Sequence, residues 1–395
     1  MNAKEILLVA AALVAGAAAE DAPEEGVTAA AKKVVSEQRN LPVPDDVRCI
    51  CVDPEVFDRC LRDRLAEDPP EDSRRAQKVL QGLGALPQAL GAADLGGCVA
   101  LDGYYDPVAR VIRLRGTKGR SEDLHRLLTH EFVHAAQDHA GFLERLGCLS
   151  SDSDEALAAR GLVEGDAVVF TDASCNGGAP VPERGEHWQG AARTSSCFAR
   201  ADIIVRYYLG PSFVAQHLAR NGGSWDSVNR LYERPPASTA ELLHPELYYE
   251  RAEPRADSVE QNGPALAGAE LAYVTVVGEL RIRLLLEEWR APGPAAAAAG
   301  WSGDRLWGFM KEERPVVVWR SVWKSSEDAD EFVGAYTAAA RRRARRFEKR
   351  GDAYVTTDGT YTSIDRRGVE VLVVTGADQD VLAAARRWWD RAHPR

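Results

Sequence analysis

The stretch LLTHEFVHAAQDH, residues 127–139, carries two histidines four positions apart, with a glutamate directly after the first. An α-helix turns by about 100 degrees per residue, so His130 and His134 lie about 40 degrees apart and both imidazoles can reach one ion. Glu131 lies on the neighbouring apolar stripe, where its carboxylate could take a proton from a water molecule activated by a metal. Two ligands do not hold a metal ion alone, so a third is needed.

A third ligand is predicted at Glu164, in the segment ARGLVEGDAVVF. A helix over about residues 155–170 would place Glu164 on the face that carries Gly161, with Gly165 at its edge. Glycine inside a helix costs about 1 kcal/mol relative to alanine, so two glycines on one face indicate that another helix approaches closely. A short carboxylate side chain on that face can then reach the metal.

The motif HEFVH followed by E-G-x-A resembles the gluzincin branch of zinc metallopeptidases. The resemblance implies that His130, His134 and Glu164 bind Zn²⁺ and that Glu131 is the general base of peptide-bond hydrolysis. Over roughly residues 98–320 the chain is also similar to an uncharacterised group of bacterial metallopeptidase-like proteins. That similarity rests on the Tyr-Asp strand before the motif, the QD after it, and the segments LVEGDA, PPASTAELLHPELYY and GWSGDRL.

The groups that orient the ligands and stabilise the oxyanion are less marked in the sequence. A metal-binding histidine usually donates its second ring N–H to an acceptor, and the positions four residues before and after Glu164 carry no carboxylate. Three aspartates remain as candidates to orient His130: Asp123, Asp138 and Asp166. The oxyanion donor is predicted to be a histidine or tyrosine, first His244, whose alternative role is capping or packing, and then Tyr208 and Tyr248.

The fold class predicted from the sequence is α+β. Residues 47–257 are expected to form a mainly helical, zincin-like metallopeptidase domain with a small N-terminal β-hairpin near residues 99–104 and 108–114. Residues 258–395 are expected to form an α+β C-terminal domain, in which LAYVTVVGELRIRLLLEEW is a helix and two ββα units follow. The segment GWSGDR is interpreted as a turn with a structural Asp304–Arg305 pair.

The start of the chain reads as a secretory signal over residues 1–19, followed by a flexible leader over residues 20–46. We therefore expect a secreted, periplasmic or cell-envelope protein with no membrane span after signal removal. Seven cysteines lie in the first half of the chain, which in an exported protein predicts disulfides. Cys175 and Cys197 are the favoured pair because they bracket a Gly-rich loop, and the remaining connectivity stays open.

Composition excludes some classes of function. Of the 395 residues, 45% are hydrophobic and 28% charged, which is ordinary for a folded protein and excludes general disorder. The formal net charge of −11 argues against nucleic-acid binding, because phosphate recognition needs a surplus of Lys and Arg. The basic run RRRARR, residues 341–346, is interpreted as a solvated helix face.

Two functions therefore remain. The first is an exported zinc metallopeptidase that hydrolyses a peptide or protein substrate. The alternative is a catalytically inactive envelope protein that keeps the metallopeptidase fold as a binding module. The intact Glu131 favours the enzyme, because a structural zinc site needs no general base and leaves no open coordination position.

Overall fold

The chain divides into two compact units. Unit 1 comprises Met1–Glu67, Leu95–Arg193 and Asp202–Tyr248, and unit 2 comprises Asp68–Asp94, Thr194–Ala201 and Tyr249–Arg395. The computed structural model describes residues 22–59, 71–86, 102–116, 121–147, 153–176, 196–251, 259, 262–343, 347–350, 353–356 and 361–392. The predicted signal peptide lies outside these residues. The predicted domain border at residue 257 is close to the last border between the units, but two earlier segments also belong to unit 2.

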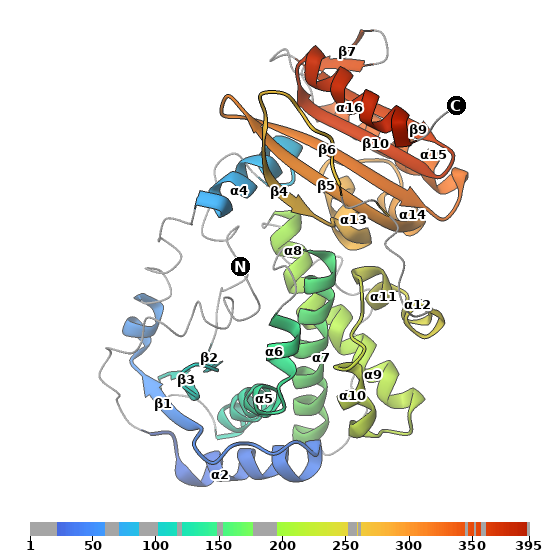
Figure 1. Ribbon diagram of the computed structural model, residues 1–395. Coiled ribbons are helices and arrows are strands. Elements are labelled where there is room, and N and C mark those ends of the chain that lie inside the picture. The colour runs from blue at the N-terminus through green and yellow to red at the C-terminus, as the bar shows by residue number, and fades with distance from the viewer. Residues whose placement is uncertain are drawn as a thin grey trace. The chain divides into compact units, whose positions relative to one another are not determined.

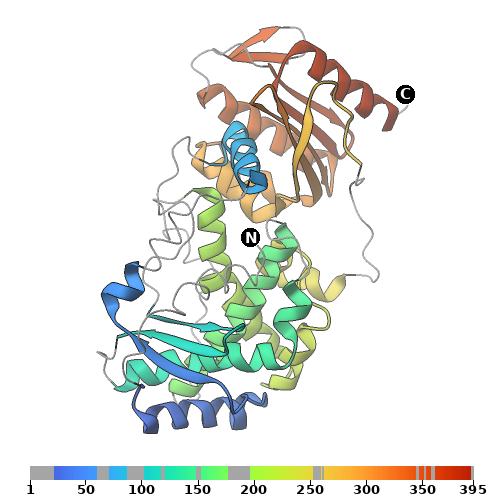
Figure 2. The same cartoon turned by 60° about the vertical axis from the view of Figure 1, so that its left-hand side comes forward.

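Unit 1 is mainly helical and contains a three-stranded sheet with the order β1-β3-β2 (Figures 1 and 2). Its strands are β1 (Arg48–Val52), β2 (Gly103–Asp106) and β3 (Val111–Arg115). β2 and β3 form the predicted antiparallel hairpin, and β1 adds to β3 in parallel. Asp106 fixes the turn of the hairpin by accepting the backbone N–H groups of Val108 and Ala109.

Two long helices of unit 1 carry the predicted ligands. α5 (Ser121–His139) agrees with the helix that the sequence predicts from Ser121 to about His139. Glu122 and Asp123 lie in its first turn, where acidic side chains are favoured by the helix dipole. α7 (Asp154–Cys175) is longer than predicted and is capped by Ser153, whose hydroxyl accepts from Ala156 N at 3.1 Å. Almost every residue of α7 up to Asp172 is buried, which marks it as the central helix of the unit.

The remaining helices of unit 1 surround these two (Figure 1). α8 begins in a segment of unit 2, and α12 ends in one. Their bounds are α2 (Glu25–Val34), the π-helix η1 (Val35–Arg39), α6 (Phe142–Gly147), α8 (Cys197–Ile204), the π-helix η4 (Val205–Leu209), α9 (Gly210–Arg220), α10 (Trp225–Leu231), α11 (Thr239–Leu243) and α12 (Pro245–Glu250).

The prediction of a flexible leader is wrong for residues 25–39, which form α2 and η1 and pack against α5 (Figure 1). Val27, Ala31 and Val35 recur every fourth residue and are buried, so they form one apolar helix face. The Ala- and Glu-rich composition concealed this spacing. The N-terminal segment is therefore part of the folded unit.

Residues 197–220 form one continuous helical run. The helix type changes within it, where the five residues of η4 lie between α8 and α9. A π-helix inserts an extra residue into the turn and shifts which side chains share a face. That shift places the side chains of η4 where an uninterrupted α-helix would not.

Unit 2 is built on a seven-stranded sheet with the order β4-β5-β6-β10-β9-β8-β7, all of whose pairs are antiparallel. The chain as a whole is therefore of mixed α+β class. The elements of unit 2 are α4 (Glu71–Leu83), β4 (Glu270–Thr275), α13 (Gly278–Glu288), α14 (Pro294–Ala299), β5 (Trp301–Lys311), β6 (Arg314–Trp323), α15 (Ser326–Arg343), β7 (Phe347–Arg350), β8 (Ala353–Thr356), β9 (Tyr361–Arg367), β10 (Glu370–Ala377) and α16 (Gln379–Ala392).

Different helices cover the two faces of this sheet. Phe332 of α15 packs against Trp319 of β6 on one face. Trp388 of α16 packs against Trp307 of β5 on the other. The faces differ because Trp307 pairs with Val318, and the side chain of the next residue, Trp319, points the opposite way. The two predicted ββα units are present as β5–β6–α15 and β9–β10–α16, with the unpredicted hairpin β7–β8 between them.

Two further predictions in unit 2 are wrong. Residues 270–275 form the edge strand β4 instead of the start of a helix, because the apolar run is divided between a strand and α13. Residues 301–305 of GWSGDR belong to β5 instead of a turn, and the Asp304 carboxylate accepts hydrogen bonds from other residues than Arg305. The Asp304 carboxylate accepts the backbone N–H groups of Val277 and Gly278 and the indole N–H of Trp301, which fixes the start of α13 to the sheet.

The predicted Cys175–Cys197 disulfide is also wrong, because both residues are free thiols. The Cys197 sulfur donates to Ala85 O within unit 2, and burial raises its pKa. Cys175, in unit 1, lies 3.9 Å from His125 Nδ1.

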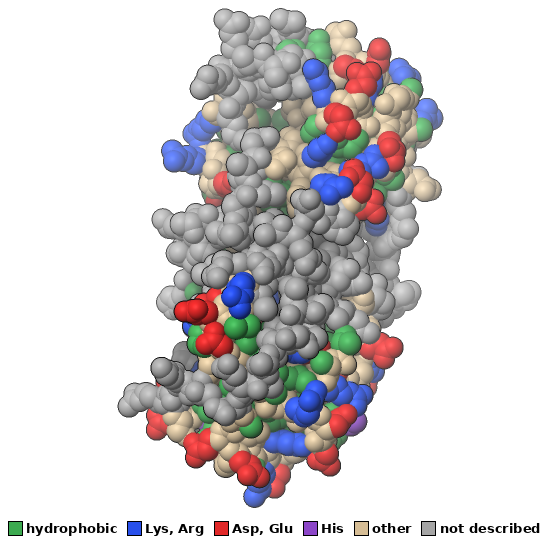
Figure 3. Space-filling view, turned by 90° about the vertical axis from the view of Figure 1, so that its left-hand side faces the viewer, with side chains coloured by type: hydrophobic (Ala, Val, Ile, Leu, Met, Phe, Trp, Pro, Cys, Tyr) green, Lys and Arg blue, Asp and Glu red, His purple; other side chains and the backbone are tan. Residues whose placement is uncertain are grey.

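On the face drawn in Figure 3, the described Lys and Arg side chains are interleaved with Asp and Glu. None of the helices in the described ranges combines the length and apolar character that a membrane crossing requires.

Candidate metal centre

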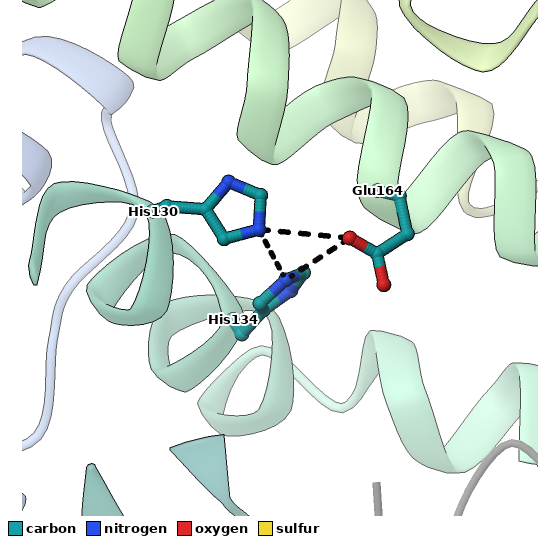
Figure 4. Close-up of side chains that lie close together, drawn as sticks. All are labelled: His130, His134 and Glu164. Carbon is teal, nitrogen blue, oxygen red and sulfur yellow. Dashed lines mark hydrogen bonds and ion pairs between the residues drawn. The ribbon is translucent and has the colours of Figure 1, made fainter. Parts of the chain in front are cut away.

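Three side chains from α5 and α7 converge in unit 1 (Figure 4). The Nε2 atoms of His130 and His134 lie 3.1 Å apart, and Glu164 Oε2 lies 3.5 Å from the first and 3.6 Å from the second. Glu164 and His134 are largely shielded, with side chains 13% and 4% exposed, and His130 is 21% exposed. The three predicted ligands are thus brought together, with one of them open to solvent.

The triangle of donor atoms fits a small divalent cation. A triangle with these sides has a centre about 2.0 Å from each corner, which matches the bond lengths of zinc to imidazole nitrogen and carboxylate oxygen. Two imidazole nitrogens facing each other at 3.1 Å also need a cation or a proton between them, because both are otherwise lone-pair acceptors. His130, His134 and Glu164 could therefore hold a metal ion.

Close packing of α7 on η4 and α9 fixes the position of Glu164. A Cβ on Gly165 would lie 2.4 Å from the carbonyl carbon of Gly210, and one on Gly161 would lie 2.6 Å from Val205 Cγ1. Both glycines therefore permit the close approach that the sequence predicted. The helix that approaches is the one carrying η4, so the side chains of η4 are brought beside Glu164.

Gly165→Ala is expected to lower the free energy of unfolding by about 2–4 kcal/mol, measured by denaturant unfolding, because the added methyl group meets rigid backbone. Gly26→Ala in α2 of the same unit is the control, since a Cβ there has nothing within 4 Å. The control should be neutral or slightly stabilising. Equal stability of the two variants would contradict the close helix contact.

Arg206 of η4 holds the second oxygen of Glu164. Arg206 Nη1 donates to Glu164 Oε1 at 2.7 Å, and its Nε donates to Asp202 Oδ2 at 2.6 Å. Asp202 in turn accepts from Arg160 Nε at 3.0 Å. Because Oε1 is engaged by a guanidinium, the arrangement leaves Oε2 alone to face the two imidazoles. Glu164 is thus prepared to bind an ion through one oxygen.

The charges at the site perturb its titrating groups. Burial alone would lower the pKa of His134, but the hydrogen bond and charge of Glu164 outweigh it and raise that pKa to about 9. Burial would raise the pKa of Glu164, but the two histidines and Arg206 hold it well below its usual value. Without a metal, the site is therefore an ionised carboxylate beside a protonated imidazole.

Zinc affinity is expected to rise by about tenfold per pH unit towards pH 9 and then level off, because a metal ion must displace the proton of His134 below its pKa. Zinc affinity increases with pH because the raised pKa keeps His134 protonated in the metal-free protein below about pH 9. Competition with a chelator of known affinity at several pH values measures the slope. An affinity independent of pH below 9 would contradict the described charge state.

Glu131 and Tyr207 lie near the three donors. Glu131 is only 5% exposed, and its charge is one of those that raise the pKa of His134. Partial burial raises the pKa of Tyr207, and the charges of Glu164 and Glu131 raise it further. The phenol of Tyr207 therefore stays protonated, and with its side chain 38% exposed it can meet a molecule that enters from solvent.

The three predicted oxyanion donors lie on η4, on α12 and directly after α11. His244 follows α11, and its backbone N–H bonds to Ala240 O. Tyr248 is buried, and its hydroxyl donates to Arg234 O, which indicates a packing role. Tyr208 is half-buried on η4, and its role stays a prediction, as does that of His244.

Two of the three aspartates predicted to orient His130, Asp138 and Asp166, have other partners, and Asp123 is exposed in the first turn of α5. Asp138 accepts from Tyr105 OH at 3.0 Å. Asp166 lies in a buried network that ends on His134 through Gln137. Sequence reasoning missed Arg206, Tyr207 and Gln137 as members of the site. In the sequence, Gln137 was noted only as part of the QD pair that contributes to the family resemblance, and it was given no role.

Comparisons with known proteins bear on unit 2 alone. Residues 270–386 match a family described as a domain of unknown function (DUF8575), a range that runs from β4 into α16. The three donors at the candidate metal centre lie outside the matched residues. Neither the comparison with curated proteins nor the comparison with solved structures found a match.

Proposed function

We propose that this protein is a zinc-dependent metallopeptidase that hydrolyses peptide bonds in a peptide or protein substrate. The observation that carries the proposal is the convergence of His130, His134 and Glu164 at distances that suit a zinc ion, with Glu131 on the same helix as the histidines. Two histidines and one glutamate leave a fourth position of a tetrahedral site for water or substrate, as in catalytic zinc sites. The proposal includes a zincin-like fold for unit 1 and export of the chain.

A bound zinc ion would polarise the substrate carbonyl and bring the pKa of a water molecule to about 7. Glu131 would act as the general base, taking a proton from the attacking water and passing it to the leaving amine. Glu131 is only 5% exposed, so its carboxylate lies in a largely water-free part of the site. Glu164 and the two imidazoles would hold the ion throughout.

Tyr207 is the described group best suited to donate to the carbonyl oxygen as it gains negative charge. It keeps its proton because burial and the charges of Glu164 and Glu131 raise its pKa, and it is partly exposed. Tyr207→Phe is expected to lower kcat about a hundredfold, with a smaller change in KM, since the hydroxyl is needed most in the transition state. Tyr208→Phe is the matched control. A larger loss in the control would return the assignment to Tyr208.

The experiment that tests the proposed function combines zinc loading with a quenched-fluorescent peptide library. Purified protein stripped of metal should cleave no peptide, and one equivalent of zinc should restore cleavage. Zinc binding without cleavage of any peptide would contradict the peptidase and favour the binding-module alternative. Cleavage that is unaffected by removing the metal would contradict the zinc mechanism.

A further inference from the structure

A buried chain of polar side chains ends on the second ring nitrogen of His134. His134 Nδ1 lies 2.9 Å from Gln137 Oε1, while the Gln137 Nε2 lies 2.9 Å from Asp166 Oδ2 and 3.1 Å from Val163 O. Gln137 and Asp166 have no solvent exposure, and His134 is 3% exposed. Polar groups this deeply buried are costly unless each is paired, so their pairing specifies the geometry.

The neighbours of Asp166 show that it is an acceptor only. Arg39 donates to both of its oxygens, from Nε at 2.8 Å and from Nη2 at 2.9 Å. The hydroxyl of Tyr232 donates to Asp166 Oδ2 at 2.8 Å. Arg39 itself is fully buried, and its charge requires a carboxylate partner. Both oxygens of Asp166 therefore accept hydrogen bonds from these donors, and Asp166 faces Gln137 as an acceptor.

The acceptors around Gln137 Nε2 fix the orientation of the Gln137 amide. The amide nitrogen faces Asp166 Oδ2 and the carbonyl of Val163, and neither of these can donate a hydrogen bond. A flipped amide would place its oxygen against both acceptors. Only one of the two possible amide orientations fits these contacts, and it directs Gln137 Oε1 at His134.

The orientation of the amide decides which nitrogen of His134 keeps its proton when a metal ion displaces the other one. An oxygen at 2.9 Å from Nδ1 accepts a hydrogen bond, so Nδ1 must be protonated. The lone pair available to a metal ion is then on Nε2, the atom that faces His130 and Glu164. A ring nitrogen with a fixed N–H partner also has a fixed ring plane.

We propose that Gln137 is a positioning residue of the metal centre, which holds His134 with Nδ1 protonated and Nε2 directed at a divalent cation, and that Asp166 and Arg39 fix the Gln137 amide for this purpose. The inference rests on the metal centre of the proposed function. It extends the site to the N-terminal segment, since Arg39 ends η1. Arg39 is held there by Asn229 Oδ1 at 2.7 Å and by the ring of Trp225.

Two variants of the same network test the proposal. Gln137→Leu removes the acceptor at His134 Nδ1. Tyr232→Phe removes a buried hydroxyl that donates to Asp166 and accepts from Gln137 Nε2 at 2.9 Å, yet it leaves the bond between Gln137 and His134 intact. Both changes disturb a buried polar network and should lower stability. Only Gln137→Leu should lower the affinity of the site for zinc.

Zinc affinity, measured by competition with a chelator, is expected to fall about 10- to 100-fold in Gln137→Leu and to change less than about threefold in Tyr232→Phe. If Gln137→Leu does not fold, Gln137→Met keeps the length of the side chain and should show the same loss. An equal loss in Gln137 and Tyr232 variants, or wild-type affinity in a folded Gln137 variant, would overturn the proposal.

A metal-independent measurement accompanies the titration. In zinc-free protein labelled with ¹⁵N-histidine, the Nδ1–H proton of His134 should exchange slowly in the wild type and in Tyr232→Phe and be lost in Gln137→Leu. Absence of this signal in the wild type would overturn the proposal. Wild-type protein that binds zinc but cleaves no peptide would contradict the peptidase function while leaving the role of Gln137 intact.

Discussion

Glu131→Gln is expected to lower kcat for peptide cleavage by about a thousandfold without loss of bound zinc. Glutamine has nearly the same shape as glutamate but cannot take a proton at neutral pH. Glu131 is not among the three donors, so the metal should stay. Cleavage kinetics and the zinc content of the same preparation measure the two effects separately.

The matched control for this variant is Glu122→Gln. Glu122 lies on the exposed first turn of the same helix, and the same chemical change there should alter neither cleavage nor zinc content. Unchanged cleavage by Glu131→Gln would remove the proposed base. Loss of zinc in Glu131→Gln would indicate that Glu131 is a ligand, which would require a different arrangement at the site.

Glu164→Gln is expected to lower zinc affinity by at least about a hundredfold, because it removes the negatively charged ligand and leaves Asp202 as the carboxylate partner of Arg206. The pKa of His134 in the metal-free variant should also fall, since burial lowers it and the Glu164 charge that raises it is gone. Metal titration and histidine NMR measure these two results.

Asp202→Asn is the control for Glu164→Gln. Asp202 touches Arg206 and does not face the two imidazoles, so its loss acts only through the guanidinium. Zinc affinity should change by less than about tenfold. If Asp202→Asn lowered zinc affinity as strongly as Glu164→Gln, Glu164 would be one member of an ionic network and not a ligand.

The sequence predicted those parts of the site that depend on regular helix geometry. α5 has the predicted bounds because a first turn of acidic residues and an apolar stripe agree along its whole length. His130 and His134 follow from a spacing of four residues on that helix. Glu164 was found because two glycines marked the face of α7 on which it lies, and the glycines do contact another helix.

The parts that were missed depend on contacts between distant residues. Arg206 contacts Glu164 from a π-helix, and the neighbouring Tyr207 is affected by the charge of Glu164. A periodicity of 3.6 residues does not predict which side chains a π-helix turns towards a neighbour. Gln137 lies three residues after His134, but its role depends on Asp166 and on Arg39, which is 127 residues from Asp166. Such partners have no local pattern.

Errors elsewhere have similar causes. The leader was judged by composition, although its buried alanine and valines recur at helical spacing. One helix was predicted for the residues of β4 and α13 because the whole run is apolar. A strand at a sheet edge is hard to distinguish from a helix by hydrophobicity alone. In both cases the tertiary neighbour, α5 or β5, decides the structure.

The most direct test of the central claim is anomalous diffraction at the zinc absorption edge from crystals of the zinc-loaded protein. We predict one peak about 2.0–2.2 Å from the Nε2 atoms of His130 and His134 and from Oε2 of Glu164. A folded protein with no peak between these three atoms, or with an ion held elsewhere while Glu164 stays bound to Arg206 alone, would contradict the account.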